Sequence, residues 1–290
     1  MSPTLFSLPL VGSGGEPIDF QRTINSHGLA GLPPASIDES GKTLHTALRV
    51  NGAPVHVTLR EADGEIQITT SAKLHGPERV EIRVAIARMF RLDDDLAPFY
   101  AMISGDPQLQ WAADGAGRML ASPTVFEDVI KTICTTNCAW SATIRMVGAL
   151  VELGGGAFPS PQELAEASEE WYRDRARMGY RGAYVRAIAA RVASGELDLE
   201  RLLPRFALAL DDVEEALLAL PGIGPYGAAH VMQLLGRHER LVLDSWTRPT
   251  FLRLAGKKQA KDRTIVRAFA RYGCYAGLAF WLFLTREWHS

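Results

Sequence analysis

The sequence is poor in cysteine, and its 290 residues contain neither a long apolar run nor a dominant charge of one sign. Its three cysteines, Cys134, Cys138 and Cys274, include no CxxC pair, which argues against a disulfide framework and against a zinc or four-cysteine iron–sulfur site. The seven histidines show no ligand spacing, so we expect no catalytic metal and no cofactor. No apolar stretch reaches membrane-spanning length, and the N-terminus lacks a secretion-signal pattern. We therefore expect a cytoplasmic protein without a membrane partner.

The charge is nearly balanced overall but uneven along the chain. The formal net charge is -2. Between residues 237 and 290, however, eleven basic residues stand against four acidic ones, which gives a local charge of +7. Such a region is typical of a surface that faces a polyanion, and a solvated helix face is the equally open alternative.

The segment of residues 43–70, TLHTALRVNGAPVHVTLREADGEIQITT, alternates apolar and polar residues. Asn51-Gly52 and Asp63-Gly64 stand at its turn positions, and both dipeptides tolerate the positive φ that tight hairpin turns need. This pattern predicts a β-meander. We expect residues 1–92 to form an N-terminal domain that is mainly antiparallel sheet.

After about residue 92 the apolar period changes from two to 3.6, as in SPTVFEDVIKTICTTN and SATIRMVGALVELGG. Ser122 with Pro123 predicts a helix N-cap and first turn, and the glycines at 154–156 predict a helix end. The LHGPERVEIR region near residue 80 is the expected linker. We therefore expect an α+β protein with an all-helical second domain at residues 93–290.

In LPGIGPYGA, residues 220–228, two glycines and two prolines fall within the five residues 221–225, between two helical runs. Pro221 ends the first helix, Gly222 and Gly224 supply positions free of side chains, and Pro225 suits the first turn of the next helix. Backbone N–H groups exposed there, beside a helix N-terminus, would bind a phosphate without recognising any base. The turn alone is equally compatible with a plain helical corner.

The segments around this hairpin resemble, in order, the helix–hairpin–helix superfamily of DNA glycosylases. LLALPGIGPYGAAHVMQLLG followed by LVLDSWTRPTFLRL is similar to the hairpin and the aspartate of that superfamily. TICTTNCAWSATIRM and MGYRGAYVRAIA resemble helices of its 8-oxoguanine glycosylase branch. YAGLAFWLFLT resembles the C-terminal helix of that branch and of the inducible bacterial 3-methyladenine glycosylases. The resemblance covers residues 95–290, and both branches also have an N-terminal β domain.

The resemblance implies an enzyme of base-excision repair whose partner is double-stranded DNA containing a damaged base. It further implies a monomer in the cytoplasm, associated with the nucleoid if the source is bacterial. A damaged-DNA-binding protein that has lost turnover is an alternative of a different class.

The resemblance places the catalytic carboxylate at Asp244, in LVLDSW. Asp244 follows an apolar run and precedes a helix expected from Ser245, so it is also a candidate N-cap. A helix N-terminus favours an ionised carboxylate. Under a flipped nucleotide, such a carboxylate would stabilise the positive charge on the deoxyribose and activate a water molecule. An aspartate that only caps its helix is the alternative.

Members of the superfamily with lyase activity carry a lysine two residues after the second hairpin glycine, where this chain has Tyr226. The resemblance therefore implies a monofunctional glycosylase that leaves the abasic site uncut. It also implies that the hairpin carbonyls of Leu218, Leu220 and Ile223 hold a monovalent cation.

The residues expected to touch DNA resemble the 8-oxoguanine branch. Asn137, in TTNCAW, matches the residue that enters the gap left by the flipped base. Tyr180 and Arg181, in GYRGAY, match the pair that presses on the opposite strand. The full expected DNA-binding set consists of these three residues and the hairpin residues Leu220, Gly222, Ile223 and Gly224.

The expected base pocket, in contrast, resembles the alkylation enzymes. Tyr226 and Trp281 match two pocket tryptophans, and Phe280 is expected beside them. Electron-rich rings suit cationic purines such as 3-methyladenine. Phe280 and Leu284 stand where the 8-oxoguanine branch carries a glutamine and a stacking phenylalanine. We therefore expect alkylated purines as substrates, with 8-oxoguanine or another oxidised purine as the alternative. A buried aromatic patch at Phe280 and Trp281 is also compatible.

Overall fold

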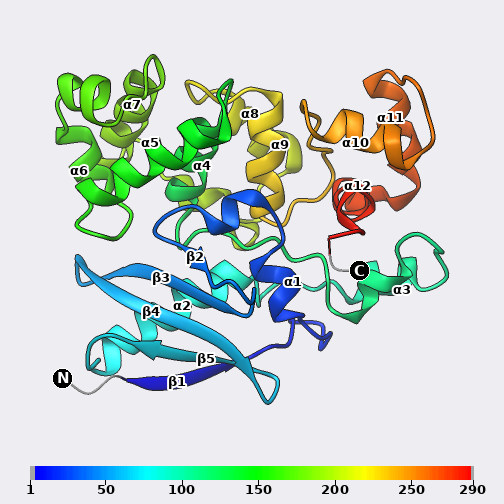
Figure 1. The fold of residues 1–290 in the computed structure, drawn as a ribbon, viewed down its shortest axis with the longest axis horizontal. Helices are drawn as coiled ribbons and strands as arrows, with labels where there is room; N and C mark the ends of the chain where they lie inside the picture. Colours follow the sequence, from blue (N-terminus) through cyan, green and yellow to red (C-terminus); the bar gives the residue numbers. More distant parts are fainter. Residues whose placement is uncertain (1–3, 289–290) are drawn as a thin grey trace.

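The N-terminal part of the chain forms a five-stranded antiparallel sheet, at the bottom of Figure 1. The structure is a computed structural model that describes residues 4–288. The strands lie in the order β1-β5-β4-β3-β2. Their bounds are β1 Leu5–Pro9, β2 Ser36–Ile37, β3 Thr43–Val50, β4 Ala53–Ala62 and β5 Glu65–Thr70.

The predicted β-meander is confirmed. Two-residue turns at Asn51-Gly52 and Asp63-Gly64 join β3 to β4 and β4 to β5. All four turn residues have positive φ, between 49° and 78°. This is the conformation of turns whose twist matches that of the strands they join.

The region predicted to be a linker is a helix, so that prediction is wrong. Helix α2, Gly76–Phe90, carries Pro77 in its first turn, where the missing N–H costs nothing. Its buried residues Ile82 and Ile86 pack into the core under the sheet. The first helical pattern therefore begins well before residue 92.

The rest of the chain is helical, which confirms the α+β class. Two apolar cores hold it together, one among α4, α5, α7, α8 and α9 and one among α3, α10, α11 and α12 (Figure 1). Within residues 4–288, no helix is both long and apolar enough to cross a membrane. The helix bounds are α1 Phe20–Ile24, α3 Ala97–Ile103, α4 Val125–Thr135, α5 Trp140–Leu153, α6 Pro161–Glu166, α7 Arg181–Ala193, α8 Leu210–Leu218, α9 Pro225–Leu234, α10 Thr247–Leu254, α11 Asp262–Phe269 and α12 Ala276–Thr285. Short segments are η1 Gly28–Gly31, η2 Gln110–Asp114, η3 Trp171–Arg175, η4 Leu199–Leu202, η5 Pro204–Phe206 and η6 Ala270–Tyr275.

Helix α4 begins two residues later than its sequence pattern predicts. Thr124, not Ser122, is the N-cap, because its Oγ1 accepts the N–H of Glu127 at 3.1 Å. Pro123 lies before the helix. The predicted helix end at residues 154–156 is confirmed, since Gly154 is the C-cap of α5.

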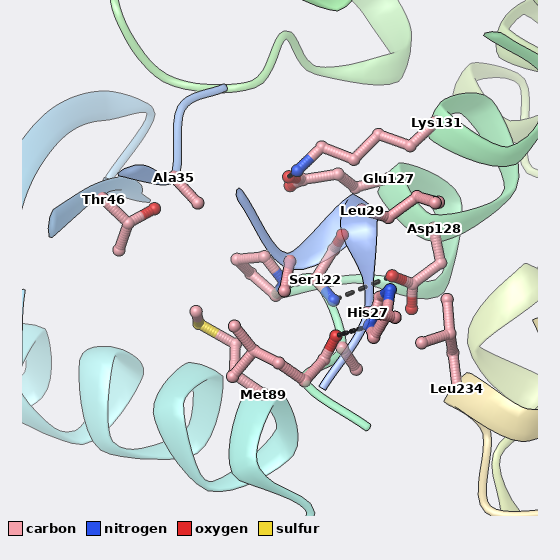
Figure 2. A pocket seen from close by; sticks show the side chains of 14 residues that line it. His27, Leu29, Ala35, Thr46, Met89, Ser122, Glu127, Asp128, Lys131 and Leu234 are labelled. Carbon is pink, nitrogen blue, oxygen red and sulfur yellow. Dashed lines mark hydrogen bonds and ion pairs between the residues drawn. The ribbon is translucent and has the colours of Figure 1, made fainter. Parts of the chain in front are cut away.

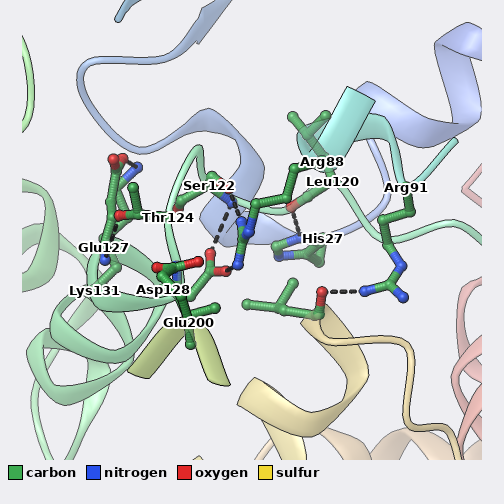
Figure 3. A network of polar contacts seen from close by, with 12 residues as sticks. His27, Arg88, Arg91, Leu120, Ser122, Thr124, Glu127, Asp128, Lys131 and Glu200 are labelled. Carbon is green, nitrogen blue, oxygen red and sulfur yellow. Dashed lines mark hydrogen bonds and ion pairs between the residues drawn. The ribbon is translucent and has the colours of Figure 1, made fainter. Parts of the chain in front are cut away.

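Buried charges connect the sheet to the central helix α4 (Figure 3). Arg88 of α2 pairs with Asp128 of α4 at 2.8 Å, and Lys131 pairs with Glu127 at 2.7 Å within α4. Burial raises the pKa of Glu127. Because breaking a buried ion pair is strongly destabilising, these contacts fix the position of α4, whose C-terminal end leads into the loop with Asn137.

A small cavity lies beside this network, between the sheet, α2 and α4 (Figure 2). Its volume is about 20 Å³, and its lining includes His27, Thr46, Met89 and Asp128. A space of this size holds about one water molecule. It is therefore too small to be the pocket for a purine base.

Candidate active site and DNA-binding surface

Helices α8 and α9 are joined by a tight turn at residues 219–224, within the predicted hairpin. Gly222 has a φ of +87°, and a Cβ atom placed on it would lie 2.7 Å from Cδ2 of Tyr184. A side chain at this position is therefore excluded twice, by the backbone conformation and by the contact with α7. Gly224 is the exposed N-cap of α9, with open space around its missing Cβ.

The turn leaves backbone donors at the start of α9. Ile223 donates its N–H to the carbonyl of Leu220 at 3.1 Å, whereas the N–H groups of Gly222 and Gly224 have no acceptor among residues 4–288. Leu220 and Ile223 are buried, so their side chains are not available to DNA. The geometry therefore suits a phosphate at Gly222 and Gly224.

The described residues include no cluster of three or more His, Cys, Asp or Glu side chains that would hold a metal ion. The hairpin cation is expected at backbone carbonyls instead. Of these, the Leu220 carbonyl already accepts the Ile223 N–H. The cation at Leu218, Leu220 and Ile223 stays a prediction.

Asp244 lies where the chain passes from the first helical core to the second, just before α10. Its Oδ1 accepts the N–H groups of Trp246 at 2.8 Å and Thr247 at 2.6 Å, and Thr247 Oγ1 accepts the N–H of Asp244 at 2.8 Å. Asp244 caps the turn that precedes α10 and is not the predicted N-cap of the helix itself, because α10 begins at Thr247 with Trp246 as its N-cap. No group among the described residues hydrogen-bonds to Oδ2, so this oxygen can act on a substrate.

Trp246, which follows Asp244 by two residues, belongs to a cluster of three tryptophans. The ring centroid of Trp246 lies 5.7 Å from those of Trp281 and Trp288, and the latter two rings are 6.0 Å apart. Trp281 is almost fully buried and donates its Nε1–H to the carbonyl of Ser26 at 3.0 Å. The cavity beside Trp281 is only about 20 Å³. The accessible aromatic surface is therefore that of Trp246 and Trp288, which are 39% and 44% exposed.

Phe280 does not share this surface, which corrects its prediction as a pocket wall. Its side chain is fully buried, 5.2 Å from the ring of Phe269 and 6.3 Å from that of Phe251. Consecutive residues on a helix point about 100° apart. Trp281 therefore turns toward Trp246 while Phe280 fills the core.

Tyr226 lies in the first turn of α9, near Asp244. Burial raises the pKa of its hydroxyl, and the negative charge of Asp244 raises that pKa further, whereas a hydrogen bond with Thr135 lowers it. The Tyr226 ring stacks on His230, with centroids 6.2 Å apart. Burial lowers the pKa of His230 to about 3 and that of His27 to about 4. Both imidazoles are neutral at pH 7, so neither supplies a proton to a reaction nearby.

Asn137 lies on the short loop between α4 and α5. It is exposed and adopts a φ of +47°. Tyr180, at the start of α7, is also exposed, and its ring centroid lies 5.7 Å from that of Tyr184, which touches the hairpin at Gly222. The hairpin, Tyr180 and the Asn137 loop are therefore neighbouring parts of the molecule.

Arg181 is buried and holds this loop from inside, which corrects the prediction that it presses on DNA. Its Nε donates to the carbonyl of Thr136 at 3.1 Å, and its Nη2 donates to the same oxygen. The Tyr180 ring lies 4.6 Å from the centre of the guanidinium. Arg181 thus fixes both expected contact residues without presenting its own charge to a strand.

The basic C-terminal region is partly neutralised. Arg240, Arg248, Arg253 and Arg271 each form an ion pair with a carboxylate. The exposed basic residues without a carboxylate partner among residues 4–288 include Lys257, Lys258, Lys261, Arg263 and Arg267, on α11 and the loop before it. A positive surface therefore remains on the side of the molecule that carries α10 and α11.

Comparisons with known proteins identify a related sequence and similar structures. No protein-family model matches the chain. Over 167 residues the chain is 29% identical to the DNA-3-methyladenine glycosylase of Bacillus subtilis. The aligned segment covers 53% of this chain and 54% of that protein. The chain therefore spans about half the length of this curated relative.

Solved structures match over a larger share of the chain. The 3-methyladenine DNA-glycosylase of Archaeoglobus fulgidus superposes with a TM-score of 0.73 at 20% identity, over 98% of this chain and 99% of that one. The chain therefore has the fold of this glycosylase. The Clostridium acetobutylicum 8-oxoguanine glycosylase/lyase, in complex with double-stranded DNA, has the same glycosylase fold, with a TM-score of 0.65, 20% identity and 88% of each chain covered. Such identities establish the fold and leave the choice of damaged base open.

Trp246 and Trp288 are not among the pocket residues expected from the sequence. A local signal for both exists in the sequence. Trp246 stands two residues after Asp244, and Trp288 follows Trp281 by seven residues, in the turn after α12 ends at Thr285.

Proposed function

We propose that this chain is a DNA glycosylase that removes alkylated purines, of the 3-methyladenine type, from double-stranded DNA. The observation that carries the proposal is that Asp244, whose Oδ2 has no hydrogen bond among the described residues, accepts the backbone N–H of Trp246, whose exposed ring clusters with those of Trp281 and Trp288. A carboxylate stabilises positive charge on a sugar, and aromatic faces attract a cationic base. The relative in Bacillus subtilis, named DNA-3-methyladenine glycosylase, supports the same choice of base.

In the proposed reaction, the bond between C1′ of the deoxyribose and the purine nitrogen breaks, and its electron pair leaves with the base. Ring alkylation gives the purine a positive charge, so the base departs as a neutral molecule. The positive charge that grows on the sugar is stabilised by Asp244. A water molecule then adds to C1′ and gives a proton to the carboxylate. One carboxylate and one water molecule are sufficient, and no cofactor takes part.

The DNA is held by residues around this carboxylate. The N–H groups of Gly222 and Gly224 bind a backbone phosphate. Asn137 enters the gap left by the flipped nucleotide, and Tyr180 supports the distorted duplex. Trp281 stands behind the two exposed tryptophans and keeps them in place, and Tyr226 closes the site beside Asp244. The protein acts as a monomer.

Oxidised purines are the second candidate substrate. Asn137 and the likeness of the fold to the Clostridium acetobutylicum 8-oxoguanine glycosylase/lyase favour them. The helix α12 argues against them. Its sequence, AGLAFWLFLT, contains no amide or carboxylate to hydrogen-bond with the polar edge of an oxidised purine.

Base release from a panel of duplexes tests the proposal. The duplexes carry 3-methyladenine or 7-methylguanine, hypoxanthine, ethenoadenine, uracil or 8-oxoguanine, and the free base is quantified by chromatography. We expect release of the methylated purines. Release of 8-oxoguanine alone would instead establish the second candidate. Tight binding to a damaged duplex without release of any base would establish a damaged-DNA-binding protein.

We also expect the enzyme to leave the abasic site uncut. Tyr226 offers no amine for a Schiff base with the sugar, and burial raises the pKa of its hydroxyl, which makes it a poor nucleophile. Borohydride added during turnover should trap no covalent protein–DNA complex, while alkali should cleave the product strands at abasic sites. A trapped complex, or cleavage before alkali treatment, contradicts this expectation.

A further inference from the structure

One large aromatic side chain near the Asn137 loop belongs neither to a core nor to the tryptophan cluster. Trp140 begins α5, three residues after Asn137, and is 45% exposed. Ile144, one turn further along the same face, is also 45% exposed. Arg145 next to it is exposed and has no carboxylate partner among the described residues.

The indole of Trp140 is held firmly on one side. A Cβ atom placed on Gly28 of η1 would lie 3.4 Å from Cη2 of Trp140 and 3.5 Å from its Cζ2. The ring therefore rests against the backbone of η1, with no side chain between them. The other side of the loop is held by Arg181 through the carbonyl of Thr136. Trp140 is thus an aromatic ring, half open to solvent, that packs against η1 at the start of α5, directly after the loop that Arg181 holds.

The surroundings of Trp140 fit a nucleic acid better than a protein surface. Asn137 offers an amide, Arg145 a free cation and Tyr180 a second exposed ring. The contact of Tyr184 with Gly222 connects them to the hairpin donors. Cations and backbone donors serve phosphates, and flat rings serve bases whose faces are uncovered. Flipping a nucleotide out of a duplex uncovers such faces on the bases around the gap.

We propose that Trp140 stacks on the base that loses its partner when the damaged nucleotide is flipped out. The proposal rests on the proposed glycosylase function and adds a residue that binds the opposite strand. Stacking does not depend on the hydrogen-bonding edge of a base, because every base has a π face. Trp140 therefore strengthens binding to distorted duplexes whichever base stands opposite the lesion.

The test uses a duplex with a tetrahydrofuran abasic analogue opposite 2-aminopurine. This analogue has no base to release, so the measurement is independent of turnover. We expect the wild-type protein to quench the 2-aminopurine emission, because the indole stacks on the fluorophore. Trp140→Ala should lose that quenching and bind this duplex on the order of ten- to a hundredfold more weakly. Its affinity for an intact duplex should change far less.

Two variants serve as controls. Trp140→Phe keeps an aromatic ring and should retain most of the affinity and part of the quenching. Ile144→Ala removes an equally exposed apolar side chain and should behave as wild type. Equal quenching and affinity in Trp140→Ala and wild type overturn the proposal, as does equal loss in Trp140→Phe and Trp140→Ala. Loss of quenching in a protein that releases no base from the panel overturns the proposed function and leaves Trp140 as a DNA contact.

Discussion

Asp244→Asn should reduce base release from methylated DNA by about 10²- to 10⁴-fold while the protein stays folded and still binds the DNA. The substitution removes the negative charge that faces the developing positive charge on the sugar. It keeps an oxygen that can accept the N–H groups of Trp246 and Thr247. Because asparagine caps helices about as well as aspartate, the start of α10 should be preserved. Single-turnover release of the base, thermal unfolding and DNA affinity together check this.

Asp262→Asn is the matched control for this variant. Asp262 also begins a helix and is paired with Arg248, in the same α10–α11 region. Its removal takes away one negative charge without touching Asp244, so release should stay within about threefold of wild type, because an exposed ion pair contributes little. Asp244→Ala is less informative, because it also loses the cap, at about 1 kcal/mol. Release by Asp244→Asn at more than a tenth of the wild-type rate counts against the catalytic role.

Gly222→Ala should weaken both the fold and DNA binding. A methyl group at a φ of +87° is strained, and it would lie 2.7 Å from Cδ2 of Tyr184. We expect a loss of roughly 1–3 kcal/mol in the free energy of unfolding. We also expect a drop of about tenfold or more in DNA affinity, corresponding to about 1.4 kcal/mol, because displacement of the turn moves the phosphate donors. Urea unfolding and fluorescence anisotropy measure the two effects.

Gly224→Ala gives the matched comparison for the hairpin. Gly224 has a φ of -104° and nothing within 4 Å of its missing Cβ. The free energy of unfolding of the Gly224→Ala variant should therefore differ from that of wild type by no more than about 0.5 kcal/mol. If Gly222→Ala destabilises the protein but leaves the affinity for DNA unchanged, the hairpin is a plain helical corner and the phosphate contact is refuted.

The features that could be predicted from the sequence are those fixed by local chemistry. The dipeptides Asn51-Gly52 and Asp63-Gly64 define their hairpins within a few residues of chain. Asp244 caps the turn before α10 through atoms of its own segment. The Gly/Pro turn between α8 and α9 likewise depends on neighbouring residues. The β-meander, the helical hairpin and the capped turn before α10 therefore follow from short stretches of sequence.

Other features depend on which neighbours the fold supplies. In α12, nearly every side chain is apolar. The sequence therefore has no contrast between an apolar and a polar face that would distinguish Phe280 in the core from Trp281 beside Trp246. Arg181 is buried because its guanidinium donates to the Thr136 carbonyl in the loop after α4, and the sequence of α7 does not reveal this contact. The sequence predicts a linker where α2 lies, because Gly76-Pro77 resembles the boundary between two elements. Proline in the first turn begins a helix as readily as it ends one.

The most direct test of the central claim is to incubate methylated double-stranded DNA with the protein and identify the products by mass spectrometry. We expect free 3-methyladenine and strands that stay intact until alkali treatment, with release by the Asp244→Asn variant reduced by about 10²- to 10⁴-fold. The absence of free methylated purines with the wild-type protein, or their equal release by the Asp244→Asn variant, would contradict the claim.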